Sequence, residues 1–490
     1  MILGRSLPVL FACSFAVVTL ASCARDAARD TASEAAPDMT PQQATAASEW
    51  IASLDDLASV EAADIDALAL PVGMTAEQTT QAADLLWDAY HDAIESKGPD
   101  EFGDLPLTMA ELAANADDDR IAIEPRRINI GSRVMPFNLV RKESLGLPEN
   151  GRALFICTHG GGANSNANGP HAWDVNTREW QTQTTLAIRA YTPEGIYFVP
   201  RMVDDRMGRW WHNHNQDAFN RLIRHAILFW GVDPNRVYKL GISEGGYGTD
   251  ILAPFMPDLF AGANAMAAGV GTGNPPENLR NLAFRTDVGE QDTQFNRVTL
   301  AKSFHERLDE LHEQDPEGYT HNINAQPGRG HGIDYRPGVP WIAEHTRNPH
   351  PDKVVWVSKQ LHGRRRGRMY WVGLTGEELL GVIYLHAEVD SENNTVTISA
   401  EQLSLSTNRN HPTHIDEQDN ADRGLLKNAT VQVMLNDQML DLDKPVTVIC
   451  NGEEVFSGPV QRSAATMLET LLERGDPQGV YPVRISIELE

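Results

Sequence analysis

VYKLGISEGGYG (Val237–Gly248) leads from an apolar run into glycines that surround one serine, Ser243. A serine at a sharp turn from strand to helix needs small residues two positions before it and two positions after it, because the backbone there is strained and crowded. Gly241 and Gly245 meet this need. The pattern alone leaves two interpretations of Ser243 open, an exposed nucleophile and a residue of a flexible loop, because a chain with 38 glycines can produce it by chance.

Short apolar runs alternate with amphipathic segments on both sides of this serine, from residue 126 to residue 351. Apolar runs at 152–158, 195–203, 236–243, 259–269 and 282–289 predict strands, and the segments at 177–191, 217–231 and 297–314 predict helices. This rhythm is typical of an α/β fold, in which helices cover both faces of a mostly parallel sheet. Functional sites in such sheets lie beyond the carboxyl ends of the strands.

The last part of the chain, residues 352–490, has a different pattern. Its apolar runs are short and of β type, and Asn451-Gly452 is a strong signal for a hairpin turn. One helix is expected between Ser463 as its cap and Gly475 just past its end. We expect a separate β-rich domain here, with a sandwich-like architecture.

The beginning of the chain divides into three segments. Residues 1–22 carry an apolar stretch of signal-peptide length that ends in LASC, and Cys23 is its last residue. This ending resembles the lipobox of bacterial lipoproteins and implies acylation of Cys23 and a membrane anchor. Residues 23–48 are small and polar and are expected to be a flexible tether. Residues 49–125 are expected to be helical and to pack on the main domain, with a capping box at Thr75 and Gln78.

The charge and the cysteine content of the chain argue against nucleic-acid binding, a metal site and a disulfide. The 68 acidic residues outnumber the 41 basic ones and give a net charge of −27, so sequence-independent binding to nucleic acid is not expected. No spacing of cysteine and histidine suggests a metal site, and no cofactor is expected. Cys157 and Cys450 lie in apolar runs and are predicted to be buried free thiols rather than a disulfide.

A second glycine motif, His159-Gly160-Gly161-Gly162, directly follows the apolar run that ends near Cys157. Acyl transfer creates an oxyanion, and glycines allow backbone N–H groups to approach it without side chains in the way. The N–H groups of Gly160, Gly161, Gly162 and Glu244 are the expected donors. A phosphate-binding loop would need further glycine or lysine signatures, which the sequence lacks.

Together, G-x-S-x-G at Ser243 and the HGGG loop resemble the α/β-hydrolase superfamily over roughly residues 126–350. Within it, the chain is similar to the polyhydroxyalkanoate-depolymerase, feruloyl-esterase and dienelactone-hydrolase groups. The resemblance implies a catalytic triad in the chain order serine, acid, histidine. Asp292 is the preferred acid, with Asp287 as its rival and Glu290 third. His331 is the preferred base, flanked by Gly330 and Gly332; the rivals are His321, His345 and His350.

Signals for the substrate are fewer. Trp210 and Trp211 lie between a predicted strand and a predicted helix and, with His159, are the candidate substrate-binding residues. The motifs predict an exported, membrane-anchored serine hydrolase that acts on a small-molecule or polymer ester. A serine peptidase with the same triad is the alternative, and a non-catalytic cell-surface binding protein is a third interpretation.

Overall fold

The computed structural model describes residues 37–490, apart from residues 58–59, 61, 99, 115–122, 145, 272–273, 378 and 404–422. The expected signal peptide, Cys23 and most of the expected tether lie outside the described residues. Among the described helices, none has the length and apolar character needed to cross a membrane.

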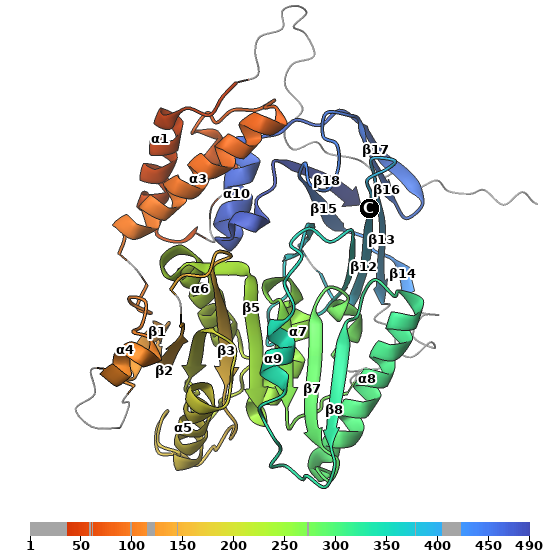
Figure 1. Ribbon diagram of the computed structural model, residues 1–490. Helices are drawn as coiled ribbons and strands as arrows, with labels where there is room; N and C mark the ends of the chain where they lie inside the picture. Colours follow the sequence, from red (N-terminus) through yellow and green to blue (C-terminus); the bar gives the residue numbers. More distant parts are fainter. Residues whose placement is uncertain are drawn as a thin grey trace, which may run out of the picture.

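Within the described residues, an eight-stranded sheet forms the centre of the molecule, in the strand order β1-β2-β4-β3-β5-β6-β7-β8 (Figure 1). Its strands are β1 (Arg126–Ile130), β2 (Arg133–Lys142), β3 (Arg152–Thr158), β4 (Gly195–Pro200), β5 (Val232–Ile242), β6 (Gly262–Met266), β7 (Ala283–Gly289) and β8 (His321–Gln326). The strands from β4 to β8 along this order pair in parallel, whereas β1 and β2 form an antiparallel hairpin at one edge.

Helices cover both faces of this sheet, which confirms the α/β class expected from the alternating pattern. Helices α5 (Asp174–Arg189) and α9 (Gly338–Ala343) contribute Ala187 and Ile342 to the core on one face. Helices α6 (Asn213–Trp230), α7 (Glu244–Phe255) and α8 (Arg297–Gln314) contribute Leu222, Leu252 and Leu308 to the core on the other face. Because β3, β5 and β7 are parallel, their carboxyl ends meet at one edge of the sheet.

The chain after the large sheet forms two further sheets, in the orders β10-β11-β15-β18 and β17-β16-β13-β12-β9, with β14 paired to β13. Their strands are β9 (Lys353–Ser358), β10 (Arg368–Met369), β11 (Val372–Thr375), β12 (Ile383–Asp390), β13 (Thr395–Leu403), β14 (Arg423–Leu425), β15 (Ala429–Leu435), β16 (Val446–Cys450), β17 (Glu453–Gly458) and β18 (Val483–Leu489). Trp356 of one sheet and Val431 of the other share a single apolar core, the arrangement of a β-sandwich. The predicted hairpin turn at Asn451-Gly452 joins β16 to β17.

The N-terminal helices are α1 (Pro41–Ser53), α2 (Ala62–Asp66), α3 (Ala76–Ser96) and α4 (Met109–Ala114). The expected tether is wrong in its last part, because Thr40 and Gln43 form a capping box that starts α1 within it. Within the expected N-terminal segment, Phe102 lies in the apolar core beside the large sheet, against Phe137 and Phe198. Helices α1 and α3 share an apolar core mainly with α10 (Ala464–Arg474), near the end of the chain, and touch the large sheet's layer through Leu228 of α6.

The arginine-rich segment Gly363–Arg368 connects the β-sandwich to the main domain. Arg366 binds Asp258, just after α7, at 3.0 Å, and Arg474 of α10 binds the same carboxylate at 2.5 Å. Burial alone would raise the pKa of Asp258, but the two arginines outweigh it and lower the pKa to about 2. These arginines therefore serve as internal partners of a buried carboxylate that joins the two parts of the chain.

Candidate active site

Ser243 occupies the turn between β5 and α7. Its backbone has φ 53° and ψ −113°, a conformation that is strained for a residue with a side chain. A Cβ on Gly241 would stand 2.2 Å from the carbonyl oxygen of Gly245, and a Cβ on Gly245 would stand 2.1 Å from that of Thr158. Both positions therefore exclude any residue larger than glycine, as the sequence pattern predicts.

The structure brings Ser243, His331 and Asp292 together from three different loops. Ser243 Oγ lies 3.0 Å from Nε2 of His331, and Nδ1 of His331 lies 2.7 Å from Oδ2 of Asp292. Asp292 is buried, and Arg297 donates to its other carboxylate oxygen at 2.9 Å. This third contact holds the carboxylate with one oxygen directed at the imidazole.

The rival acids and bases have other partners. Asp287 is buried in β7, where it accepts two hydrogen bonds from Arg285 at 2.9 Å and others from Asn264 (2.9 Å) and Asn324 (2.6 Å). Among the rival histidines, His321 lies against His305 and His350 against Asn436. In the described part of the chain, none of these rivals contacts Ser243.

The glycine loop lies directly beside the serine. A Cβ on Gly160 would stand 3.4 Å from Cβ of Ser243. The N–H groups of Gly160 and Gly161 have no hydrogen-bond partner among the described residues. As the first residue of α7, Glu244 also has an N–H with no acceptor inside the helix. These three N–H groups are free to bind an oxyanion.

The expected set of oxyanion donors is wrong for Gly162. Its N–H donates to Oδ1 of Asn176 at 3.0 Å, and its carbonyl accepts from Nδ2 of Asn176 at 2.9 Å. The N–H is therefore already engaged. Gly162 has φ 133°, and its part in the site is to hold the loop in this extended turn rather than to bind substrate.

Two of the three candidate substrate-binding residues, Trp210 and His159, also need correction. Trp210 is fully buried, and its indole N–H donates to the carbonyl of His159 at 3.0 Å. His159 is fully buried as well and accepts from the N–H of Met202 at 3.0 Å; burial lowers its pKa to about 3, so the ring stays neutral. Both side chains support the glycine loop from beneath. Trp211 is partly exposed and lies under Arg209.

Asn176 and Asp205 are supporting residues that the sequence patterns did not reveal. Asn176 lies in the first turn of α5 and donates to Asp205 at 2.7 Å, in addition to its two bonds with Gly162. Asp205 is fully buried and forms a salt bridge with Arg201 at 2.6 Å. An asparagine near the start of a helix gives no distinctive signal in a sequence, because such positions are commonly polar.

Replacing Asn176 with alanine is expected to lower kcat by about 10²-fold, because a mispositioned glycine loop loses oxyanion donors. Binding of substrate in the ground state should change little, so KM should stay within a few-fold. The measurement is steady-state kinetics on an ester substrate. Asn168→Ala, an exposed asparagine of the same loop, is the control. An unchanged kcat in Asn176→Ala would show that the loop keeps its shape without this side chain.

Lys239 is a buried cation beneath the serine, on β5. Its ammonium donates to Oγ1 of Thr158 at 2.6 Å, just before the glycine loop, and to Oγ1 of Thr249 on α7 at 3.0 Å. Burial lowers its pKa from 10.5 to about 7. The lysine thus ties the two backbone segments of the site together, at an energetic cost for carrying a charge in the interior.

The free energy of unfolding is expected to rise with pH, by up to about 1.4 kcal/mol per unit, from pH 7 to about 8.5. In this window the unfolded chain binds a proton on Lys239 that the folded chain has released. Above pH 8.5, burial of Cys157 opposes this rise. Burial raises the pKa of the Cys157 thiol, so the unfolded chain loses the thiol proton there while the folded chain keeps it, and the free energy of unfolding falls. Urea unfolding at several pH values would measure the slope. Lys239→Met should flatten it, and Lys302→Met, an exposed lysine, should not.

The carboxylate of Glu179, on α5, lies beside Gly160 of the glycine loop, and Ser243 lies beside the same glycine. Its Oε2 lies 2.8 Å from the position that a Cβ on Gly160 would take, and Cβ of Ser243 lies 3.4 Å from that position. Glu179 makes no ion pair among the described residues. A carboxylate beside Gly160 disfavours further negative charge on any group of a substrate that lies close to it.

Cysteines and possible metal ligands lie outside this arrangement. Cys157 and Cys450 are free and buried, as predicted. Within the described residues, His91, Asp92 and Glu95 of α3 have ligand atoms within 4.8 Å of one another. They are partly or fully exposed on a helix that contributes no residue to the serine, histidine and glycine-loop arrangement.

No protein-family model matches the sequence, and no curated protein matches it. Among solved structures, 46% of the chain is similar to a thermostable esterase, with 18% sequence identity, a TM-score of 0.34 and 63% of that chain covered. The same share of the chain is similar to a protein described as a putative dipeptidyl aminopeptidase IV from Bacteroides ovatus, with 16% identity, a TM-score of 0.33 and 34% of that chain covered. A poly(3-hydroxybutyrate) depolymerase from Bordetella parapertussis is similar over 46% of this chain and 89% of its own (14%, 0.32). The chain thus spans less than two thirds of the first two structures.

Proposed function

We propose that the protein is a serine hydrolase that cleaves a carboxylic ester through an acyl-enzyme intermediate. The observation that carries this proposal is the hydrogen-bonded series from Ser243 Oγ to His331 Nε2 (3.0 Å) and from His331 Nδ1 to Asp292 Oδ2 (2.7 Å). A serine hydroxyl is a weak nucleophile unless a base takes its proton, and the base must be held by a third group. The strained backbone of Ser243 adds support, because such strain concentrates at functional sites.

In the proposed reaction, Ser243 Oγ attacks the carbonyl carbon while His331 Nε2 takes the hydroxyl proton. The N–H groups of Gly160, Gly161 and Glu244 stabilise the negative charge that develops on the carbonyl oxygen. His331 then gives the proton to the leaving alcohol, and the acyl-enzyme forms. Water, activated by the same imidazole, releases the acid. These steps need no cofactor.

A serine peptidase of the same fold is the alternative, since ester and amide cleavage share this nucleophile and base. The third interpretation, a non-catalytic binding protein, would be favoured by loss of the nucleophile, the base or the glycine loop, and the sequence retains all three. A panel of short acyl esters, feruloyl esters and peptides separates these readings. We expect turnover of esters; cleavage of peptides without cleavage of esters would favour the peptidase, and no turnover of either would favour the binding protein.

The charge of the substrate is a second variable of that panel. Because the Glu179 carboxylate lies beside the glycine loop, esters with an anionic acyl group should be cleaved several-fold more slowly than neutral esters of the same size. Glu179→Gln should reduce this difference. Equal rates for both charges in the wild-type protein would contradict a role of Glu179 in selectivity.

We also propose that the protein is exported and held to a bacterial membrane by acylation of Cys23. The support is the apolar stretch that ends in LASC and the small, polar residues after it. In cells fed labelled palmitate, the wild-type protein and Cys13→Ser should carry the label, whereas Cys23→Ser should not. Label that persists in Cys23→Ser would refute the anchor.

A further inference from the structure

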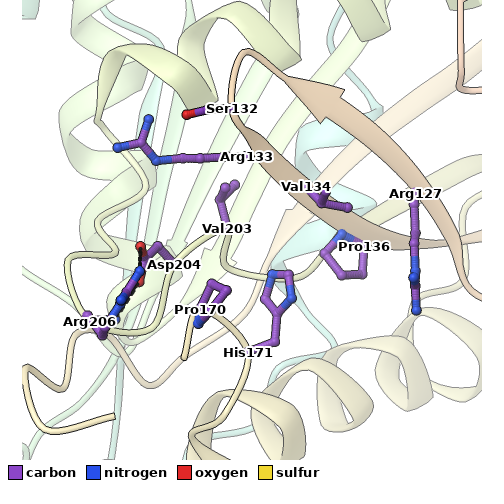
Figure 2. A pocket seen from close by; sticks show the side chains of 10 residues that line it. All are labelled: Arg127, Ser132, Arg133, Val134, Pro136, Pro170, His171, Val203, Asp204 and Arg206. Carbon is purple, nitrogen blue, oxygen red and sulfur yellow. Dashed lines mark hydrogen bonds and ion pairs between the residues drawn. The ribbon is translucent and has the colours of Figure 1, made fainter. Parts of the chain in front are cut away.

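A cavity with a volume of about 500 Å³ lies beside the β1–β2 hairpin (Figure 2). Its walls come from the hairpin, from the segment after β4 and from the residues that precede α5. The side chains that decide its chemistry are Arg127, Arg133, His171, Val203, Asp204 and Arg206. None of them belongs to the triad or to the glycine loop, so the cavity is separate from the proposed catalytic machinery.

The cavity has an excess of positive charge. Arg206 pairs with Asp204 at 2.8 Å, and its side chain remains 48% exposed. Arg127 and Arg133 are exposed, and within the described residues neither guanidinium has an ion pair or a hydrogen bond. Three arginines therefore face one carboxylate. In a chain with a net charge of −27, where carboxylates are abundant, two arginines left unpaired around one cavity point to an anion as the missing partner.

Apolar side chains lie between these charges. Figure 2 shows Val134 and Pro136 on one side of the cavity and Pro170 and Val203 on the other. His171 lies among them. Burial, followed by the charge of Arg201, lowers the pKa of His171, so its ring is neutral at pH 7. The lining therefore suits a ligand with an apolar body and one or more charged groups at its ends.

The walls of the cavity are held firmly. The N–H of Asp205 donates to the carbonyl of Pro170 at 2.8 Å, which ties the segment of Asp204 and Arg206 to that of His171. The Asp205 carboxylate is in turn fixed by Arg201 at 2.6 Å. A preformed cavity of this volume lies in the range of small-molecule sites, roughly 300–1,000 Å³.

We propose that this cavity binds an amphiphilic oxyanion, that is, a phosphate or carboxylate group attached to an apolar body. Figure 2 shows Arg127 and Arg133 at opposite ends of the cavity, so the oxyanion binds to the guanidinium group at one of these ends, since arginine matches phosphate and carboxylate geometry with paired N–H donors. Val134, Pro136, Pro170 and Val203 contact the apolar body. The residues that line the site belong to neither the triad nor the glycine loop, although Asp205 supports both places, through Pro170 and through Asn176.

Calorimetric titration of full-length Ser243→Ala protein tests the proposal without interference from turnover. The probes are 1-naphthyl phosphate, 1-naphthoate and the neutral 1-naphthalenemethanol. At least one anionic probe should bind, and the neutral probe should bind at least about tenfold more weakly, because it lacks the charge-assisted hydrogen bonds to arginine. Equal binding of all three probes, or no binding of either anion, would overturn the proposal.

Arg127→Gln/Arg133→Gln in the same background should raise the Kd for the anion at least about tenfold, whereas Arg189→Gln, an exposed arginine of α5, should not. Both substituted arginines are exposed, so the variant should keep its melting temperature. Unchanged affinity in the double variant would refute the site. Cosedimentation with phosphatidylglycerol vesicles, compared with phosphatidylcholine vesicles, separates two possible sources of the anion. If the protein binds the phosphatidylglycerol vesicles and the double variant does not, the anion is a lipid headgroup. If the protein binds only the soluble probe, the anion is a free one.

Discussion

Ser243→Ala is expected to lower kcat/KM for an ester by at least about 10⁴-fold and to abolish labelling by a fluorophosphonate. The proposed reaction has no other nucleophile, and the N–H groups of the glycine loop alone leave only a small residual rate. The fold should be unaffected, because among the described residues the hydroxyl of Ser243 bonds to His331 alone. The measurements are steady-state kinetics and gel detection of the labelled protein.

Two comparisons make this experiment decisive. Ser165→Ala, an exposed serine just after the glycine loop, should keep full activity and full labelling. His331→Ala should lose as much activity as Ser243→Ala, since the two groups act as a unit. Labelling that survives in Ser243→Ala would refute the proposed mechanism, whatever the effect on kcat.

Asp292→Asn is expected to lower kcat by about 10⁴-fold and also to lower the melting temperature, because the buried Arg297 loses the charge of its partner. An asparagine at this position can donate to Nδ1 of His331, which favours the tautomer that cannot accept the proton of Ser243. Arg297, the other partner of Asp292, is the buried first residue of α8, and its side chain also donates to the hydroxyl of Tyr247 at 2.9 Å.

Asp287→Asn should resemble Asp292→Asn in stability but differ from it in turnover. Its carboxylate neutralises Arg285 inside β7, and a buried charge left without its partner destabilises a protein by about 3–5 kcal/mol. We therefore expect a lowered melting temperature with kcat, per folded molecule, close to the wild-type value. Thermal unfolding measured beside the kinetics of both variants tests this. Near-normal turnover in Asp292→Asn together with loss in Asp287→Asn would reverse the assignment of the acid.

Features that depend on a few neighbouring residues could be predicted from the sequence. The turn at Ser243 excludes side chains at Gly241 and Gly245 through contacts with nearby backbone, and so any sequence that adopts it must show the two glycines. The capping box at Thr75 and the hairpin at Asn451 are local in the same sense, because their hydrogen bonds close within three residues. The alternation of apolar runs gave the α/β class, since each element must bury one face.

Features that depend on partners distant in the chain could not be predicted in this way. Asp287 and Asp292 are five residues apart, and only the register of β7 with β8, together with the position of Arg297, decides which carboxylate reaches His331. The sequence predicts that the N–H of Gly162 is free to bind an oxyanion. In the folded chain α5 places Asn176 beside it, and this N–H donates to the side chain of Asn176 instead.

The sequence by itself determined the strained serine, the glycine loop and the layered α/β architecture, because steric limits on the backbone and the periodic burial of apolar residues act over short distances. Tertiary structure alone decided that Trp210 supports the glycine loop instead of binding substrate, that α10 covers the N-terminal helices, and that Arg127 and Arg133 both line the cavity beside the β1–β2 hairpin. Each of these depends on which segments meet across the folded chain, and that is set by the packing of whole layers rather than by any local pattern.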